Sequence, residues 1–164
     1  MSTTQIAPSP FQNARAILST FAANLSVITA NVKGLSQQDS LIQLAPSANC
    51  LNWTLGHIIV SRDRALTLVN EAPVWTQERS LPYQSGSKPL NQNEGATLEV
   101  ILQALNESQT KLTITIEQLK DSDLSKPLRS KTLGQTLTGF AWHETYHAGQ
   151  TALYRRLAGP DGAI

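Results

Sequence analysis

The sequence predicts an all-α protein: one domain over residues 1–164, built as a four-helix bundle with a long connection between the second and third helices. Three observations support this fold class. Four stretches carry apolar residues at the period of a helix, and no segment shows the sustained apolar–polar alternation of a strand. The length of 164 residues suits one well-formed core and would cramp two.

The first two helices are predicted from apolar spacing and from the turn formers beside them. We expect the first over residues 11–32, because its apolar positions follow the helical period and Lys33–Gly34 supplies a cation in the last turn and a glycine after it. We expect the second over residues 52–69. Three turn formers precede it: Pro46, Ser47 and Asn49.

Residues 70–96 form the long connection and are too rich in proline, glycine and asparagine to be a helix. A connection of this length can cross the bundle and let the helices that it joins run parallel. Because it carries Trp75 and Tyr83, we expect it to pack as a lid over one end. The third helix follows at 97–120, where leucine and isoleucine alternate at spacings of four and three with a polar break at Gln109.

The fourth helix, predicted over residues 132–158, carries two of the three histidines. His143 and His147 are four residues apart, so their side chains lie about 40° apart and project from one face of a helix. That face belongs to the apolar stripe expected to contact the core, together with Glu144, while Gln150 lies at its margin. Polar groups in such a stripe need partners, and a divalent metal is a suitable partner for two imidazoles.

The third histidine, His57, lies on the second helix and could complete a site of three nitrogens. Its side of the helix is shared with Trp53, Val60 and Arg64, so periodicity leaves open whether it faces the fourth helix. His-x-x-x-His pairs also arise by chance, and the alternative is two core histidines with hydrogen-bond partners. We expect Arg62 and Arg64 at the surface or at the rim of a site.

The composition limits which classes of binding partner are expected for this chain. A net charge of +1 with 15% charged residues gives no reason to expect nucleic acid or an anionic membrane surface as a partner. No stretch approaches the 18 apolar residues of a spanning helix. Cys50 is the only cysteine, which excludes an intrachain disulfide, and we expect it to be a small buried residue. Residues 1–10 lack the basic and apolar regions of a signal peptide, so the expected location is cytoplasmic.

The letters His-Glu-x-x-His at residues 143–147 match the zincin protease signature, but the surrounding sequence does not. The extended metzincin motif needs a glycine at Gln150 and a histidine at Leu153. The other zincin layout needs a downstream glutamate, and none of the 17 residues after His147 is a glutamate. A protease is therefore rejected.

Two segments resemble the DinB-like superfamily. Residues 143–159, with His-x-x-x-His-x-Gly-Gln, are similar to the last helix of that family, and residues 52–62, with Trp-x-Leu-Gly-His, to its second helix. Together with the long second connection, the resemblance covers essentially the whole chain. It implies an up-down-down-up bundle and one divalent metal held by His57, His143 and His147. The understood members include thiol S-transferases and a thiol-dependent isomerase, so it also implies a small-molecule substrate, a low-molecular-weight thiol and a homodimer.

Three neutral imidazoles leave open positions on a metal, and zinc, nickel or iron(II) would accept this ligand set. Glu144 is the candidate general base or ligand orienter, and Gln150 the candidate for bonding a substrate or water. Gly139 and Gly149 would permit close helix approach or leave room for a substrate. We expect a metal-dependent thiol S-transferase or small-molecule hydrolase. The alternative is a non-catalytic bundle, stapled by its metal, that acts in stress response or in protein interaction.

Overall fold

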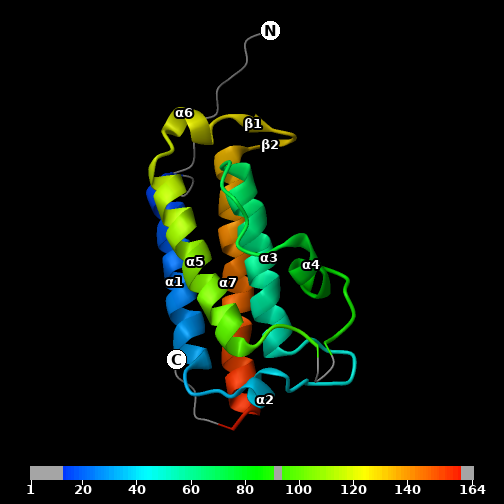
Figure 1. Ribbon diagram of the computed structural model, residues 1–164. Helices are drawn as coiled ribbons and strands as arrows, with labels where there is room; N and C mark the ends of the chain where they lie inside the picture. Colours follow the sequence, from blue (N-terminus) through cyan, green and yellow to red (C-terminus); the bar gives the residue numbers. More distant parts are fainter. Residues whose placement is uncertain (1–12, 91–93, 160–164) are drawn as a thin grey trace.

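The computed structural model describes residues 13–90 and 94–159, and nearly all of its regular structure is helical, which confirms the all-α class. Four long helices lie side by side (Figure 1): α1 (Ala14–Val32), α3 (Leu51–Leu68), α5 (Leu98–Glu117) and α7 (Leu133–Leu157). The short elements are α2 (Gln37–Ser40), α4 (Gln77–Ser80), a 3-10 turn η2 (Leu81–Tyr83), α6 (Asp121–Leu124), β1 (Pro127–Leu128) and β2 (Lys131–Thr132). None of the described helices has the length and apolar character that crossing a bilayer requires.

The long helices lie close to their predicted positions. The largest difference at a described end is in α5, which stops at Glu117 instead of residue 120. Thr132 caps α7 reciprocally: its hydroxyl accepts the Gln135 N–H, and the Gln135 side chain accepts the Thr132 N–H. Gly34 follows α1 with a φ of 78°, a conformation that suits glycine. The predicted start of the first helix at Phe11 lies outside the described residues.

A short hairpin, β1 with β2, stands before α7 and was not predicted. Pro127 pairs with Thr132 and Leu128 with Lys131, antiparallel. Strands of two residues are too short for an alternating pattern to be recognised.

The connection between α3 and α5 covers the flank of α3, so the expected lid over one end of the bundle is wrong. Figure 1 shows α4 beside the middle of α3. Trp75 and Tyr83 are both buried, with ring centroids 5.1 Å apart. Asp63 on α3 anchors the connection by accepting the backbone N–H groups of Val74 (2.7 Å) and Trp75 (3.1 Å). Because of this cover, α3 is buried on nearly every side from Leu51 to Asp63.

The connection comes into close contact with the backbone of α3 at Gly56. A Cβ at this position would overlap the ring of Tyr83, so only glycine lets the connection reach the α3 backbone. A methyl group at Gly139 or Gly149 would meet no atom of another element within 4 Å in the described structure, so close helix approach does not explain these two glycines.

Candidate metal centre

The three histidines come together where α3 lies against α7. The ring centroids of His57 lie 5.1 Å from those of both His143 and His147, and the latter two rings are 4.5 Å apart. One ligand nitrogen from each ring lies within 4.8 Å of the other two. His57 therefore faces the fourth helix, the point that periodicity left open. These residues could hold a metal ion.

Each histidine has a partner for its Nδ1 atom. His57 Nδ1 lies 2.8 Å from the carbonyl oxygen of Tyr83, and His147 Nδ1 lies 2.8 Å from Gln150 Oε1. His143 Nδ1 lies 3.4 Å from Ser61 Oγ. A carbonyl oxygen can only accept, so Nδ1 of a neutral His57 carries the hydrogen and Nε2 holds the lone pair. The same assignment for the other two rings presents three Nε2 lone pairs to one point, as in metal sites whose ligands are oriented by outer partners.

The spacing of these nitrogens fits a divalent metal. His143 Nε2 and His147 Nε2 are 3.1 Å apart. Zinc bonds to imidazole nitrogen at about 2.0–2.1 Å, which in a tetrahedral site separates two nitrogens by about 3.3 Å. Without a metal, this contact fits an N–H···N hydrogen bond in which one ring carries its hydrogen on Nε2. With the hydrogens of both rings on Nδ1, both Nε2 lone pairs would be available to one shared cation.

Burial keeps the three imidazoles neutral. It lowers the pKa of His147 to about 4, although the hydrogen bond with Gln150 acts in the opposite direction. Burial is also the largest cause of the lowered pKa of His57 and of His143, and the positive charge of Arg64 adds to both. The neutral ring is the form that binds metal, so at neutral pH these histidines are in the form that could hold one.

The histidines lie at a cleft of about 450 Å³ that is lined by α3, by α7, by the segment before α3 and by the connection. His143 is half-buried, and His147 is 8% exposed. Trp53 stacks on His57, with centroids 4.7 Å apart and planes 9° from parallel, and shields one face of that ring. Gln150, predicted to act at the site, lies in the cleft lining and donates from Nε2 to the Tyr146 hydroxyl at 3.0 Å. A ligand entering the cleft would meet Tyr146 and Gln150 beside the histidines.

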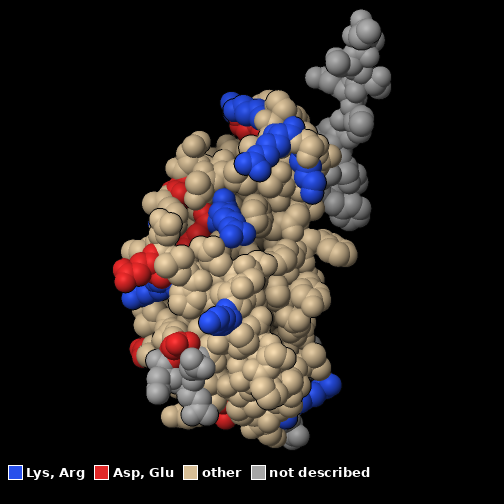
Figure 2. All heavy atoms as spheres, turned by 90° about the vertical axis from the view of Figure 1, so that its right-hand side faces the viewer, with Lys and Arg blue, Asp and Glu red and all other residues tan. Residues whose placement is uncertain are grey.

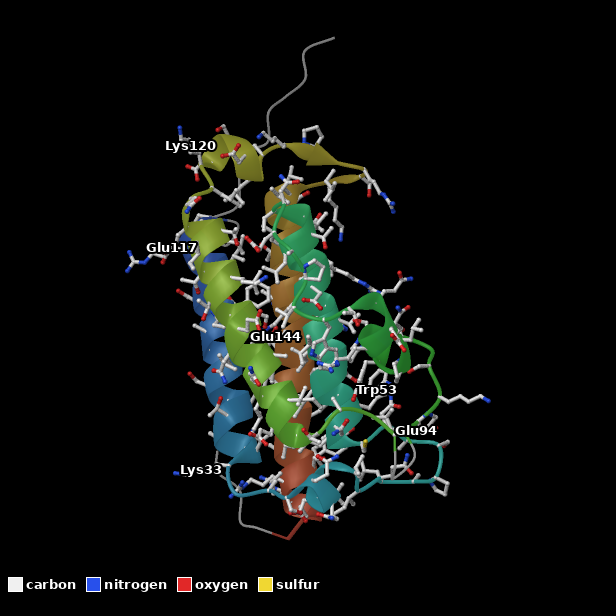
Figure 3. The ribbon with its side chains drawn as sticks, in the orientation of Figure 1. Lys33, Trp53, Glu94, Glu117, Lys120 and Glu144 are labelled. Carbon is white, nitrogen blue, oxygen red and sulfur yellow. The ribbon has the colours of Figure 1, made fainter. Side chains whose placement is uncertain are left out.

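Glu144 lies away from this cleft, in the middle of the four long helices, where Figure 3 labels it. Its two oxygens accept from Arg62: Nε to Oε2 and Nη2 to Oε1, each at 2.8 Å. Both side chains are almost fully buried. The expectation of Arg62 at the surface or rim is therefore wrong. Glu144 is paired with Arg62, and its role as a general base or ligand orienter stays a prediction. Arg64, in contrast, is exposed as expected.

Sequence reasoning did not identify two partners of the histidines. Ser61 lies one turn after His57, on the same side of α3, so its spacing could have indicated it. The Tyr83 contact is made by a backbone carbonyl from the connection, for which a side-chain pattern carries no signal. Cys50 is fully buried at the start of α3, as predicted, and burial raises the pKa of its thiol.

Comparison with known proteins supports one family. Residues 13–151 match the model of the DinB superfamily. Six chains of solved structures are similar to this chain. One, described as a conserved protein from Enterococcus faecalis, has a TM-score of 0.70 at 16% identity and covers 93% of this chain and 98% of its own. That likeness shows the fold. Comparison with curated proteins gave no match.

Proposed function

The chain belongs to the DinB superfamily, and we propose that it is a metal-dependent enzyme that transfers a small thiol to an electrophilic substrate. The observation that carries this proposal is the convergence of His57, His143 and His147 beside a cleft with room for a small molecule. Zinc, nickel and iron(II) are the proposed metals, one per chain.

A divalent metal at this site would act as a Lewis acid and lower the pKa of a thiol or water bound to it. The protein's own groups orient the site. The Tyr83 carbonyl and Gln150 fix the rings of His57 and His147, and Trp53 keeps water from one face of His57. In the transfer, the thiol loses its proton to solvent and its sulfur forms a bond to the electrophilic carbon, whose leaving group or π bond takes the electron pair.

A thiol is favoured over water as the nucleophile because the described residues that line the cleft include no carboxylate. Hydrolysis would benefit from a general base near the attacking water, and Glu144 is engaged by Arg62. Transfer of a thiol needs less help, because a thiol is far more acidic than water and its anion is a strong nucleophile. Cys50 cannot supply the sulfur, since it is fully buried and absent from the cleft.

Because Arg62 engages the candidate general base Glu144, a second candidate function is one in which the metal is structural. In that case the metal only staples α3 to α7, and the protein acts in stress response or in protein interaction. The absence of a carboxylate from the described cleft lining is consistent with this alternative too.

Cobalt-substituted protein separates these functions. Titration with cysteine or glutathione should produce a sulfur-to-cobalt charge-transfer band. Cys50→Ala should retain the band and His57→Ala should lose it. A spectrum changed by azide or acetate but not by thiols would replace thiol transfer with hydrolysis. A spectrum that no small ligand changes would leave the structural role.

The arrangement proposed for the chain is the up-down-down-up four-helix bundle, in which the long connection allows α3 and α5 to run parallel.

We further propose a homodimer formed through α7. Trp142, Tyr146 and Leu153 are 76%, 64% and 51% exposed, and with Gly149 they follow spacings of four, three and four. Trp142→Glu should shift the sedimentation equilibrium toward the monomer, and a monomeric wild-type protein would contradict this proposal.

A further inference from the structure

A second cavity, of about 500 Å³, lies on the same two helices as the histidines. Its lining comes from α3, from the β1–β2 hairpin and from α7. On α3, Arg64 in this cavity follows His57 by seven residues, or about 10 Å along the helix axis. On α7, Phe140 in this cavity precedes His143 by one turn. The two cavities therefore lie one after the other along α3 and α7, and Figure 1 shows the hairpin, which lines the second cavity, at the upper end of the bundle.

The lining of this second cavity combines positive charge with an apolar surface. Arg64, Arg129 and Lys131 contribute three cations, and the described lining residues include no carboxylate. None of the three takes part in an ion pair within the described part of the chain. Figure 2 shows Lys and Arg gathered at the upper end of this face, where the hairpin lies in Figure 1. Unpaired cations around a concave surface attract anions.

The apolar part of the cavity is formed by Leu68, Leu128 and Phe140, all half-buried. Apolar side chains that converge with a few charged groups are typical of small-molecule sites. A bare inorganic anion would leave this apolar surface in contact with water, whereas an organic anion would cover it.

The backbone holds the cations of the hairpin in place. Arg129 adopts a φ of 55°, a left-handed conformation uncommon outside glycine, at the turn between β1 and β2. The N–H of Leu133 donates to the Lys126 carbonyl at 3.0 Å, which ties the first residue of α7 to the hairpin. The backbone positions of Arg129 and Lys131 at this cavity are therefore held by the hairpin and its link to α7.

We infer that this pocket binds the anionic end of a small organic acid. A carboxylate, sulfonate or phosphate would lie among Arg64, Arg129 and Lys131, with the apolar body of the molecule on Leu68, Leu128 and Phe140. The spacing along α3 allows one molecule to place its anion here and its reacting group at the histidines. That last step rests on the proposed function and assigns the substrate class: an electrophile or thiol with an anionic end.

Titration with 4-phenylbutyrate tests the pocket, with binding measured by calorimetry and by changes in amide chemical shifts in NMR spectra. The expected result is shift changes at Ser130, Lys131 and Thr136, with neutral 4-phenylbutyramide binding about tenfold more weakly. The triple variant Arg64→Gln/Arg129→Gln/Lys131→Gln should lose about tenfold in affinity. The matched control is Arg15→Gln/Lys88→Gln/Arg156→Gln, which removes two arginines and one lysine that are exposed elsewhere and should bind as wild type does.

Three results would overturn the inference: equal binding of the amide, equal binding of inorganic phosphate, or unchanged affinity in the triple variant. All titrations use metal-free and zinc-loaded protein. Probe binding in the metal-free form depends on the pocket alone, and metal content depends on the histidines alone. Failure of this inference is thereby distinguished from failure of the proposed function.

Discussion

Arg62 and Glu144, 82 residues apart in the sequence, form a bidentate ion pair in the interior of the protein. The guanidinium also donates to the carbonyl oxygens of Leu105 (2.8 Å) and Phe21 (3.4 Å), so one side chain of α3 contacts all three other long helices. A buried charge is tolerated only when it is paired and hydrogen-bonded, and here both conditions hold. The pair therefore fixes how the four helices meet.

Breaking this pair should destabilise the fold. Glu144→Gln leaves the Arg62 charge buried without a counter-charge, which we expect to cost about 3–5 kcal/mol of unfolding free energy in urea. The double variant Arg62→Met/Glu144→Leu removes both charges and should lose much less. If Glu144→Gln is as stable as wild type but abolishes thiol transfer, Glu144 is a general base after all.

Gly56 provides a test of how the connection orients His57. In Gly56→Ala the new methyl group overlaps the Tyr83 ring and displaces the segment whose carbonyl holds His57. We expect a loss of about 1–3 kcal/mol in stability, together with weaker zinc binding. The matched control is Gly139→Ala, which meets nothing within 4 Å and should stabilise its helix by about 0.5–1 kcal/mol. Unchanged zinc affinity in Gly56→Ala would show that the connection does not orient His57.

The pH dependence of the metal-free protein follows from the lowered histidine pKa values. His147 has a pKa of about 4 in the folded state and an ordinary value of 6.5. Between these values the unfolded chain binds more protons than the folded chain, so stability rises with pH. The melting temperature of chelated protein should therefore fall as the pH drops from about 6.5 towards 4, and less so in His147→Gln. Identical pH profiles for the two proteins would contradict this account.

Removal of the metal should lower stability only when the site is intact. A ligand that binds only the folded state raises the free energy of unfolding, so chelation of wild-type protein should reduce its melting temperature. His147→Ala lacks one ligand and should respond little to the same chelator. Equal shifts in both proteins would mean that the chelator acts elsewhere.

Local pattern was enough to predict the helices and the pairing of His143 with His147, because a spacing of four residues fixes their common face. It did not determine whether His57 faces the fourth helix. The α3 helix is buried on nearly every side, since the connection covers the flank that solvent would otherwise reach, so no single face of it could be identified as the core face from apolar spacing. The role of Arg62 was missed for a related reason: its partner Glu144 lies on another helix, and only the packing of α3 against α7 joins them. Gln109, the polar residue that interrupts the apolar pattern of the third helix, is itself a partner of this arginine: its Oε1 accepts a hydrogen bond from Arg62 at 3.1 Å.

The most direct test of the account is the zinc content of untagged protein, measured by elemental analysis after reconstitution and removal of free metal. We predict about one zinc per chain in wild type and in Cys50→Ala, because three histidines build one site and Cys50 has no part in it. His57→Ala should retain well under half of that amount while remaining folded by circular dichroism. A wild-type protein without zinc, or a His57→Ala variant with its full complement, would contradict the central claim that α3 and α7 share one metal.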